Sequence, residues 1–315
     1  MGKKTADALW MALTILLLMT LALLIPSAGA VAEEVVLATG LNPLPVDLTA
    51  GPKPDKSKYF ADGTGYQDDS IYVKIYQDRA YESNILYVHI KIADPTQLRT
   101  APASTFVHKG NQLAATIAKR YHAVAAINGD YFQFNTERHI VRQGTLVRNR
   151  PTGEDLLFID SAGDFHVAYR ARKPEVEAAR AAIDAQGRTV VNAFSFGPIL
   201  VDNDQAVFPE KENYFNTAAL KRAQRAIIAQ LGPLEYMIVS TEGPEDPSSQ
   251  GLQLHEAALY TVEAAHKLGK TCLYAYNLDG GSSNSLVLNG EKVNSPKNPK
   301  KRAVSDIIYF ATLVP

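Results

Sequence analysis

The chain contains 315 residues, of which 46% are hydrophobic and 21% are charged, and its formal net charge is −1. This is the composition of a globular protein that can bury a sizeable core, as one large domain or two small ones. The balanced charge gives no indication of a basic binding surface, so we exclude nucleic acid as an expected partner.

The first 32 residues have the features of a targeting segment. Lys3 and Lys4 precede an uncharged apolar run over residues 8–25, and small residues at 28, 30 and 32 suit a signal-peptidase site. The run is also near the roughly 18 to 20 residues that span a bilayer. We expect residues 1–32 to be a cleaved signal peptide, and an uncleaved membrane anchor is the alternative. Both place the rest of the chain outside the cell or at its surface.

Residues 33–69 are rich in Pro, Asp, Gly and Lys. This composition predicts a poorly ordered spacer in front of a domain over residues 70–315. A single cysteine, Cys272, excludes an intrachain disulfide. That fits a Gram-positive cell surface better than a eukaryotic lumen.

The domain alternates unevenly between strand patterns and helix patterns. Strand composition marks residues 71–76, 85–92, 123–127, 190–194 and 271–278, the first two as an antiparallel pair. Helical spacing of apolar residues marks 111–121 and 253–268. An alanine-rich helix over 174–185 is indicated by Pro174 at its start and Gly187 after its end. Residues 142–148 have the pattern of a hairpin, whose Arg142 and Arg148 are as consistent with solvent exposure as with phosphate binding. We expect a mixed α/β (α+β) fold, a single catalytic domain in which a large, partly antiparallel sheet is flanked by helices.

One strand ends in a stretch suited to ligand binding. The apolar run from Thr271 to Leu278 stops at Asp279, which is followed by Gly280, Gly281 and short polar residues. Glycines let backbone N–H groups approach a ligand closely, and a strand end can aim a carboxylate. A hairpin turn is the alternative, because Asp-Gly and Gly-Gly are also favoured in turns.

Two further stretches are built in a similar way. Residues 125–132 run from an apolar strand into Asn128, Gly129 and Asp130, and then into aromatic side chains of the kind that stack on sugars. Residues 194–201 contain Gly197 followed by a proline, and a turn at the rim of the site is the alternative explanation for this pair.

In order and spacing these stretches, together with Arg225-Ala226-Ile227-Ile228 and Arg302-Ala303-Val304-Ser305-Asp306, resemble the phosphodiester glycosidase family. The resemblance covers roughly residues 70 to 313. It implies cleavage of the bond between the anomeric carbon of a sugar and a phosphate. The leaving phosphate monoester is acidic and needs little protonation. The demand therefore falls on stabilising an oxocarbenium-like centre and on holding the phosphate.

This chemistry and the resemblance together suggest two groups of site residues. Asp279 and Asp130 are the candidates for nucleophile or base. Arg225 and Arg302 would hold phosphate oxygens. The backbone N–H groups of Gly280 and Gly281 would assist them. Asp306 would fix a neighbouring arginine rather than react. The expected substrate-binding residues are Asn128, Gly129, Tyr131, Gly197, Arg225, Gly280, Gly281, Ser282, Ser283 and Arg302.

The chain departs from the family pattern at three places. Ser282 stands where a third glycine is usual, and Ala229 stands where a glycine is expected after residues 225–228. Ser240-Thr241-Glu242 stands where the family has Asp-Gly-Arg. This last departure removes an arginine and an aspartate and leaves Glu242 as a replacement acid, the third catalytic candidate.

We expect an exported hydrolase that cleaves the sugar-phosphate linkage of a glycosyl-1-phosphodiester, such as a GlcNAc-1-phosphodiester, in a cell-surface polysaccharide or glycoconjugate. The alternative is a non-catalytic glycan-binding or structural protein on the same fold. The reason to consider it is that Glu242 and its neighbours replace the Asp-Gly-Arg of the family. A metal-dependent phosphodiesterase ranks lower because the histidines do not cluster, and the His255-Glu256 pair has Leu259 where a zinc motif needs a second histidine. We expect no cofactor, with a divalent metal left open, and membrane contact only through the N-terminal segment.

Overall fold

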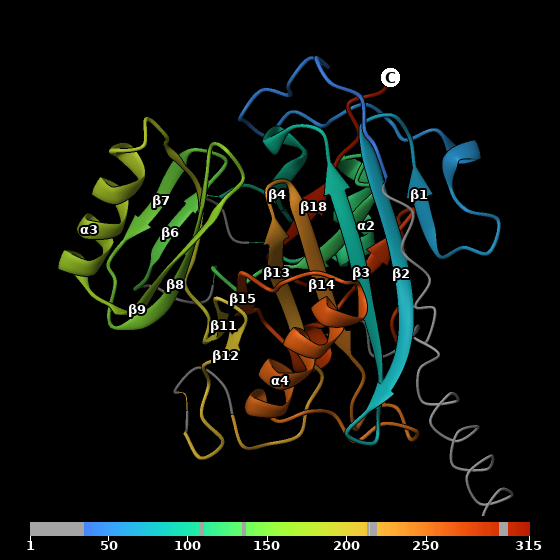
Figure 1. The fold of residues 1–315 in the computed structure, drawn as a ribbon. Coiled ribbons are helices and arrows are strands. Elements are labelled where there is room, and N and C mark those ends of the chain that lie inside the picture. Colours follow the sequence, from blue (N-terminus) through green and yellow to red (C-terminus); the bar gives the residue numbers. More distant parts are fainter. Residues whose placement is uncertain (1–34, 107–109, 134–136, 213, 215–218, 296–301) are drawn as a thin grey trace, which may run out of the picture. The chain divides into compact units, whose positions relative to one another are not determined.

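The computed structural model describes residues 35–106, 110–133, 137–212, 214, 219–295 and 302–315. The predicted signal peptide or anchor, residues 1–32, lies outside the described residues. Residues Val36–Pro315 form one compact unit. Within its described part, strands pair in antiparallel fashion throughout and build three sheets (Figure 1).

The largest sheet has eight strands in the order β1-β2-β3-β14-β13-β15-β11-β12. These strands are β1 (Gly65–Gln67), β2 (Ile71–Ala80), β3 (Ser83–Ile92), β14 (Glu235–Thr241), β13 (Ala226–Gly232), β15 (Tyr274–Asn277), β11 (Ile199–Asp202) and β12 (Gln205–Ala206).

The two smaller sheets have five strands each. One has the order β7 (Thr145–Asn149), β6 (His139–Arg142), β10 (Val190–Phe194), β8 (Glu154–Asp160) and β9 (Phe165–Ala171). The other has the order β17 (Glu291–Lys292), β16 (Val287–Leu288), β5 (Ala125–Asn128), β18 (Asp306–Phe310) and β4 (Leu98–Pro102).

The described helices are α2 (Ala114–Arg120), α3 (Lys173–Asp184) and α4 (Leu254–Lys267), with the short 3-10 turns η1 (Lys56–Lys58), η2 (Pro95–Gln97) and η3 (Gly281–Ser283). The sequence favours a helix at α4 because its alanines recur with helical spacing, and because Glu256 closes the first turn by accepting a hydrogen bond from the backbone N–H of Gln253 (2.9 Å).

Each face of the eight-stranded sheet packs against a different layer. In β13, Ile227 and Ala229 point into the cluster that includes α4, whereas the alternate residue Ile228 points into a core shared with both smaller sheets. This alternation follows from the period of two in a strand. The larger core therefore lies between sheets, and α4 covers the opposite face (Figure 1).

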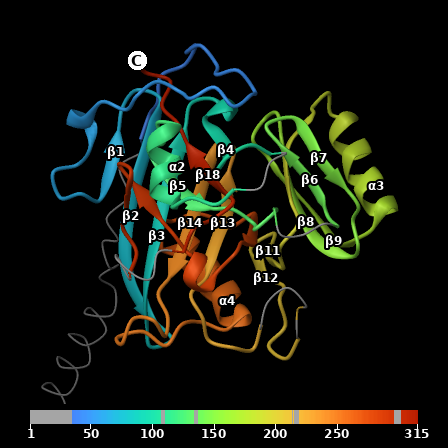
Figure 2. The same cartoon turned by 180° about the vertical axis from the view of Figure 1, so that it is seen from behind.

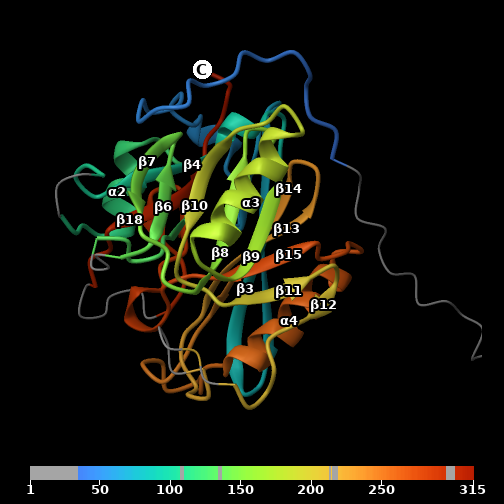
Figure 3. The same ribbon diagram turned by 90° about the vertical axis from the view of Figure 1, so that its left-hand side faces the viewer.

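The other two helices cover the smaller sheets. Ile117 of α2 packs on Ile307 of β18, and α2 lies beside β5 and β18 in the view from behind (Figure 2). Val176 and Ile183 of α3 pack on Phe158 of β8, so α3 lies across β8 and β9 (Figure 3). Every sheet thus buries apolar side chains against a helix on one face.

The segment expected to be a poorly ordered spacer contributes to this unit. Its strand β1 pairs with β2, and the guanidinium of the buried Arg99 donates hydrogen bonds to the carbonyls of Pro45 (2.9 Å), Asp47 (2.9 Å) and Thr49 (3.0 Å). The expectation of disorder was therefore wrong for these residues. A segment rich in proline and glycine can be irregular and still be held, if side chains from the domain satisfy its carbonyl groups.

The predicted mixed fold is confirmed, and its sheet organisation is richer than expected. The predicted helices correspond to α2, α3 and α4, the hairpin to β6 and β7, and the antiparallel pair to β2 and β3. In place of one large, partly antiparallel sheet there are three antiparallel sheets.

Within the described residues, we find no helix that is both long enough and apolar enough to cross a membrane.

Candidate active site

The ends of strands from all three sheets meet in one place. Asn128 ends β5 and lies opposite Ile307 in β18, so the next residues, Gly129 and Asp130, pass beside Asp306. Arg142 ends β6, and Asp279 follows the end of β15. Hydrogen bonds and an ion-pair network join these ends.

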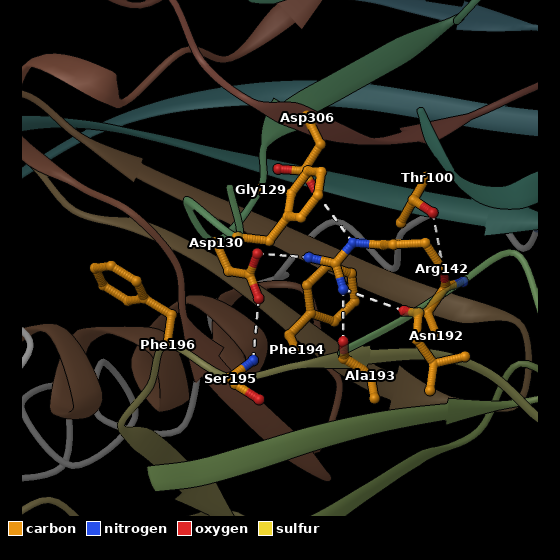
Figure 4. Close-up of polar contacts among 12 residues, drawn as sticks. Thr100, Gly129, Asp130, Arg142, Asn192, Ala193, Phe194, Ser195, Phe196 and Asp306 are labelled. Atoms are coloured by element: carbon orange, nitrogen blue, oxygen red, sulfur yellow. Dashed lines mark hydrogen bonds and ion pairs between the residues drawn. The ribbon is translucent and has the colours of Figure 1, made fainter. Parts of the chain in front are cut away.

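Arg142 is the centre of this network (Figure 4). Its side chain is fully buried, its Nη2 donates to Asp130 Oδ1, and its Nε donates to Asp306 Oδ2 at 3.0 Å. Its Nη1 donates to the carbonyls of Val141 (3.1 Å) and Ala193 (2.5 Å). A buried guanidinium is stable only with such partners, so the network holds β6 and β18 to the segment after β5.

Aromatic rings and a backbone N–H complete the surroundings of Arg142 and Asp130. The guanidinium carbon lies 4.2 Å from the ring centroid of Phe194 and 5.4 Å from that of Phe132. Ser195 N donates to Asp130 Oδ2 at 3.0 Å. Both oxygens of Asp130 therefore accept hydrogen bonds, and the orientation of this carboxylate is fixed (Figure 4).

The loop after β15 is joined to the end of β5 through backbone groups. Asp279 N donates to Gly129 O (3.2 Å), and Asn128 Nδ2 donates to Asp279 O (2.6 Å). Asn128 Oδ1 accepts from Ser285 N (3.0 Å). The Asn128 amide thus sets the position of Asp279, which is a structural role rather than a direct contact with a sugar.

Two of the acids have strongly altered ionisation. Burial raises the pKa of Asp279 to about 6, while the Ser283 hydroxyl and the charge of Arg302 lower it and the charge of Asp130 raises it. Burial also raises the pKa of Asp306 to about 7, against the opposing effect of Arg142. Carboxyl groups that titrate near neutral pH are suited to proton transfer.

Most of the predicted site residues are brought together. The charge of Asp130, the hydroxyl of Ser283 and the charge of Arg302 all act on Asp279. Tyr131 follows directly, half-buried and with a positive φ of 65°. The predicted residues that lie in or beside this cluster are Asn128, Gly129, Asp130, Tyr131, Asp279, Gly280, Gly281, Ser282, Ser283 and Arg302.

Two groups that were expected to contact phosphate, the Arg225 guanidinium and the Gly281 N–H, donate hydrogen bonds to backbone carbonyls instead. The main chain of Arg225 borders Gly280, but its buried guanidinium donates to Leu252 O (2.9 Å) and Lys221 O (2.6 Å), and burial lowers its pKa to about 10. The N–H of Gly281 donates to Gln224 O (2.9 Å). Both expectations are corrected: these groups stabilise the walls of the site and do not face a phosphate.

Glu242 and Gly197 both make contacts other than those expected of site residues. The carboxylate of Glu242 accepts from Asn84 Nδ2 (3.1 Å) and Ser295 N (2.8 Å), and it lines a separate cavity of about 620 Å³ at the β2–β3 hairpin. Gly197 approaches the hydroxyl of Tyr214, and its carbonyl accepts from Asn277 Nδ2 (2.8 Å). Glu242 therefore does not replace an acid of the cluster, and Gly197 serves close packing.

Arg142 is the important residue that the sequence did not single out. The sequence left solvent exposure and phosphate binding as alternatives for the hairpin arginines. Solvent exposure is wrong for Arg142, because its side chain is buried. Phosphate binding does not fit it either, because carboxylates and carbonyls accept hydrogen bonds from its guanidinium. The expectation that Asp306 fixes an arginine is confirmed. The available signal was weak: an arginine directly after the apolar pair Ile140-Val141, in a strand that is buried at every position.

Among the described residues, no group of three metal-ligating side chains lies close enough to hold a metal ion. Asp130 and Asp306 already share Arg142, which favours an ion-pair function for these acids.

Comparisons with known proteins show which family and which solved structures the chain resembles. A family model described as phosphodiester glycosidase matches residues 121–311. No curated protein matches the chain. Among solved structures, the zebrafish N-acetylglucosamine-1-phosphodiester α-N-acetylglucosaminidase catalytic domain, auto-inhibited by its pro-peptide, is 18% identical with a TM-score of 0.58, over 76% of this chain and 82% of that chain. A hypothetical protein from Synechocystis is 17% identical with a TM-score of 0.51, over 76% of this chain and 62% of that chain. These two likenesses show a shared fold.

Proposed function

The chain belongs to the phosphodiester glycosidase family, and from this premise we propose that it hydrolyses the sugar-phosphate bond of a glycosyl-1-phosphodiester. The zebrafish protein of the same fold is named for such an activity on a GlcNAc-1-phosphodiester. The cluster of Asp279, Asp130 and Arg142 supports a catalytic role, because its acids are held on the ends of rigid strands.

The observation that carries the proposal is the difference between the two candidate acids. Asp130 has both oxygens engaged by Arg142 and Ser195. Asp279 is half-buried, and burial raises its pKa to about 6. A carboxylate that is accessible and titrates near the working pH is the better base, so we assign the reacting role to Asp279.

The hydrolytic step can be written with Asp279 as base. Water attacks the anomeric carbon as Asp279 accepts its proton, and the bond from that carbon to the phosphate oxygen breaks. The electron pair leaves with the phosphate monoester, which needs little protonation because it is acidic. If Asp279 instead attacks the sugar as nucleophile, the anomeric configuration is retained rather than inverted, and the configuration of the released sugar distinguishes the two.

The phosphate requires a cation that is not already occupied. Arg142 is buried and shared by two carboxylates, whereas Arg302 is exposed and its charge acts on Asp279. We therefore assign phosphate binding to Arg302. Its planar guanidinium suits bidentate contact with phosphate oxygens.

The test is product analysis with a defined substrate. The full chain is incubated with the methyl phosphodiester of GlcNAc-1-phosphate, and we expect free GlcNAc and methyl phosphate. Binding without turnover would support the alternative, a glycan-binding protein that kept the fold. GlcNAc-1-phosphate as product, with loss of activity in chelator, would support a metal-dependent phosphodiesterase, which cuts the P–O bond.

We further propose that the natural substrate is a cell-surface polysaccharide or glycoconjugate and that the protein is exported. The apolar run over residues 8–25 and the small residues that follow support export. N-terminal sequencing of secreted material should show a start near Val31 or Glu33. Recovery of intact Met1 in a membrane fraction would support the anchor instead.

A further inference from the structure

The buried unit formed by Arg142, Asp130 and Asp306 has one cation and two acids. All three side chains are at most 1% exposed. With both acids ionised, the unit would carry a net negative charge in a region that water does not reach. Such a charge is costly, and a proton on one acid removes it.

The two acids differ in how completely they are paired. Asp130 accepts at both oxygens, from Arg142 and Ser195. Asp306 accepts from Arg142 Nε through Oδ2 (3.0 Å), but its Oδ1 has no hydrogen-bond partner among the described residues. This Oδ1 lies directly against Gly129, where an added Cβ would be only 2.1 Å away. The unpaired oxygen makes Asp306 the acid that holds the proton, and burial raises its pKa to about 7.

Hydrogen bonds connect Asp306 to Asp279, the acid to which we assign the reaction. Its carboxylate holds Arg142 Nε, and Arg142 Nη2 holds Asp130. Its own backbone carbonyl accepts from Gly129 N (3.0 Å), and Gly129 O accepts from Asp279 N (3.2 Å). A change in the charge or position of Asp306 therefore reaches both Asp130 and Asp279.

We propose that Asp306 is a positioning residue that acts through Arg142, and that in its protonated form it fixes Asp130 without adding negative charge to a site that receives an anionic phosphodiester. The proposal rests on the proposed function for the identity of the substrate. Asp306 touches no reacting atom. Its contribution is to keep the site well ordered and less negative.

The charge of the site predicts how binding depends on pH. The groups that face Asp306 are Arg142 at the end of β6, Asp130 after β5 and Asp279 after β15. As the pH rises through about 7, Asp306 loses its proton and adds a negative charge beside Asp130 and Asp279. That charge repels a phosphodiester, so KM for an anionic substrate rises, by roughly three- to tenfold for one added buried charge.

The experiment compares an anionic and a neutral substrate on the full chain. KM is measured from pH 5 to 9 for the methyl phosphodiester of GlcNAc-1-phosphate and for an uncharged aryl α-glycoside of GlcNAc. We expect the wild type to show the alkaline rise in KM only for the phosphodiester. Asp306→Asn should remove most of the rise above pH 7, because the amide imitates a protonated carboxyl and cannot ionise. Asp184→Asn, the same change on the exposed face of α3, should behave like the wild type.

A rise of equal size for both substrates, or one that persists in Asp306→Asn, would overturn the proposal. The wild-type comparison also decides the matter if that variant does not fold. If neither substrate is turned over, the proposed function fails separately, and the protonation of Asp306 is then tested by comparing the thermal unfolding of the wild type with that of Asp306→Asn from pH 4 to 8. Because ionisation of Asp306 disfavours folding between about pH 4 and 7, the stability of Asp306→Asn relative to the wild type should rise through this range. Equal slopes would overturn the inference without reference to activity.

Discussion

The ends of β5 and β15 have similar sequences and different physical states. Each is an apolar strand with an asparagine at its last position, followed by an acid and glycine within three residues. Asp130 is 1% exposed and is held by the charge of Arg142 and the N–H of Ser195. Asp279 is half-buried, and burial raises its pKa to about 6. Asp130 thus has fixed donors at both oxygens, whereas Asp279 is only partly withdrawn from water.

This difference separates positioning from reaction. A carboxylate whose oxygens are both satisfied by fixed donors has little capacity left for a proton or a carbon centre. A carboxylate that is partly desolvated, and that water or substrate can still reach, changes its protonation near neutral pH. Similar motifs at strand ends thus do not imply equal roles, and the surrounding donors decide which acid reacts.

The largest expected effect comes from removing the cation that pairs Asp130. Arg142→Met removes the charge and much of the hydrogen bonding, and it leaves Asp130 and Asp306 buried without their shared partner. We expect a loss of about 3–5 kcal/mol in the free energy of unfolding, measured with urea at pH 7. The control is Arg170→Met, at a guanidinium that is 76% exposed and pairs with Glu212, where at most about 1 kcal/mol should be lost. Equal losses would show that the buried pair is not what holds these strand ends.

The next effect tests the reacting acid. Asp279→Asn keeps the shape of the side chain and removes its charge. We expect kcat to fall on the order of a hundredfold or more on the glycosyl phosphodiester, with no loss of thermal stability at pH 7. Asp130→Asn is the matched variant at the other strand end, and it should lose stability as well as activity because it unpairs Arg142. An Asp279→Asn protein that turns over normally would identify Asp279 as a turn former and transfer the role to Asp130.

The elements of the fold could be predicted from local patterns, and their assembly could not. Local patterns located α2, α3, α4 and the hairpin of β6 and β7, because these elements depend on residues close in sequence. The pairing of β5 with β18 depends on chain segments far apart, for which no local pattern exists. The division into three sheets therefore became visible only in the structure.

The candidate site was predictable to the same extent. Acids and glycines after apolar strands identified Asp130 and Asp279, because a strand end has a recognisable composition. For two buried arginines, Arg142 and Arg225, the expected surroundings were wrong. Arg225 was expected to face phosphate but donates to carbonyls, whereas Arg142 was not singled out but holds two acids. What a guanidinium pairs with is a tertiary property, and neighbouring residues do not encode it.

A smaller effect is expected from crowding the contact between Gly129, after β5, and Asp306, at the start of β18. Gly129→Ala would place a Cβ 2.1 Å from Asp306 Oδ1, so the strand ends must shift. We expect a loss of about 1–3 kcal/mol by urea unfolding, with a reduced kcat. Gly232→Ala, at the end of β13, is the control, because its nearest neighbour would be 3.9 Å away and it should change stability by about 0.5 kcal/mol or less. If Gly129→Ala is equally mild, the close packing of Asp306 is not required.

The smallest effect concerns pH and follows from the raised pKa of Asp279. If its carboxylate is the base, kcat/KM should fall about tenfold for each pH unit below about 6 and level off above it. The acid limb would lie near the ordinary value of 3.8 if burial did not affect this group. Measurement of kcat/KM from pH 4 to 8 separates the two.

The same acid limb of kcat/KM should persist in Asp306→Asn, because that change removes only the ionisation of Asp306, which is centred near pH 7. Stability gives an independent check of sign. Since the pKa of Asp279 is raised in the folded state, ionisation disfavours folding, and this group destabilises the protein as pH rises from about 4 to about 6. Asp279→Asn should therefore reduce the loss of stability in that window, to which Asp306 also contributes, whereas Asp130→Asn should lower stability across the whole range. An acid limb that stays near pH 4, with no change in the unfolding profile, would mean that Asp130 and Asp279 do not differ in their ionisation and pairing.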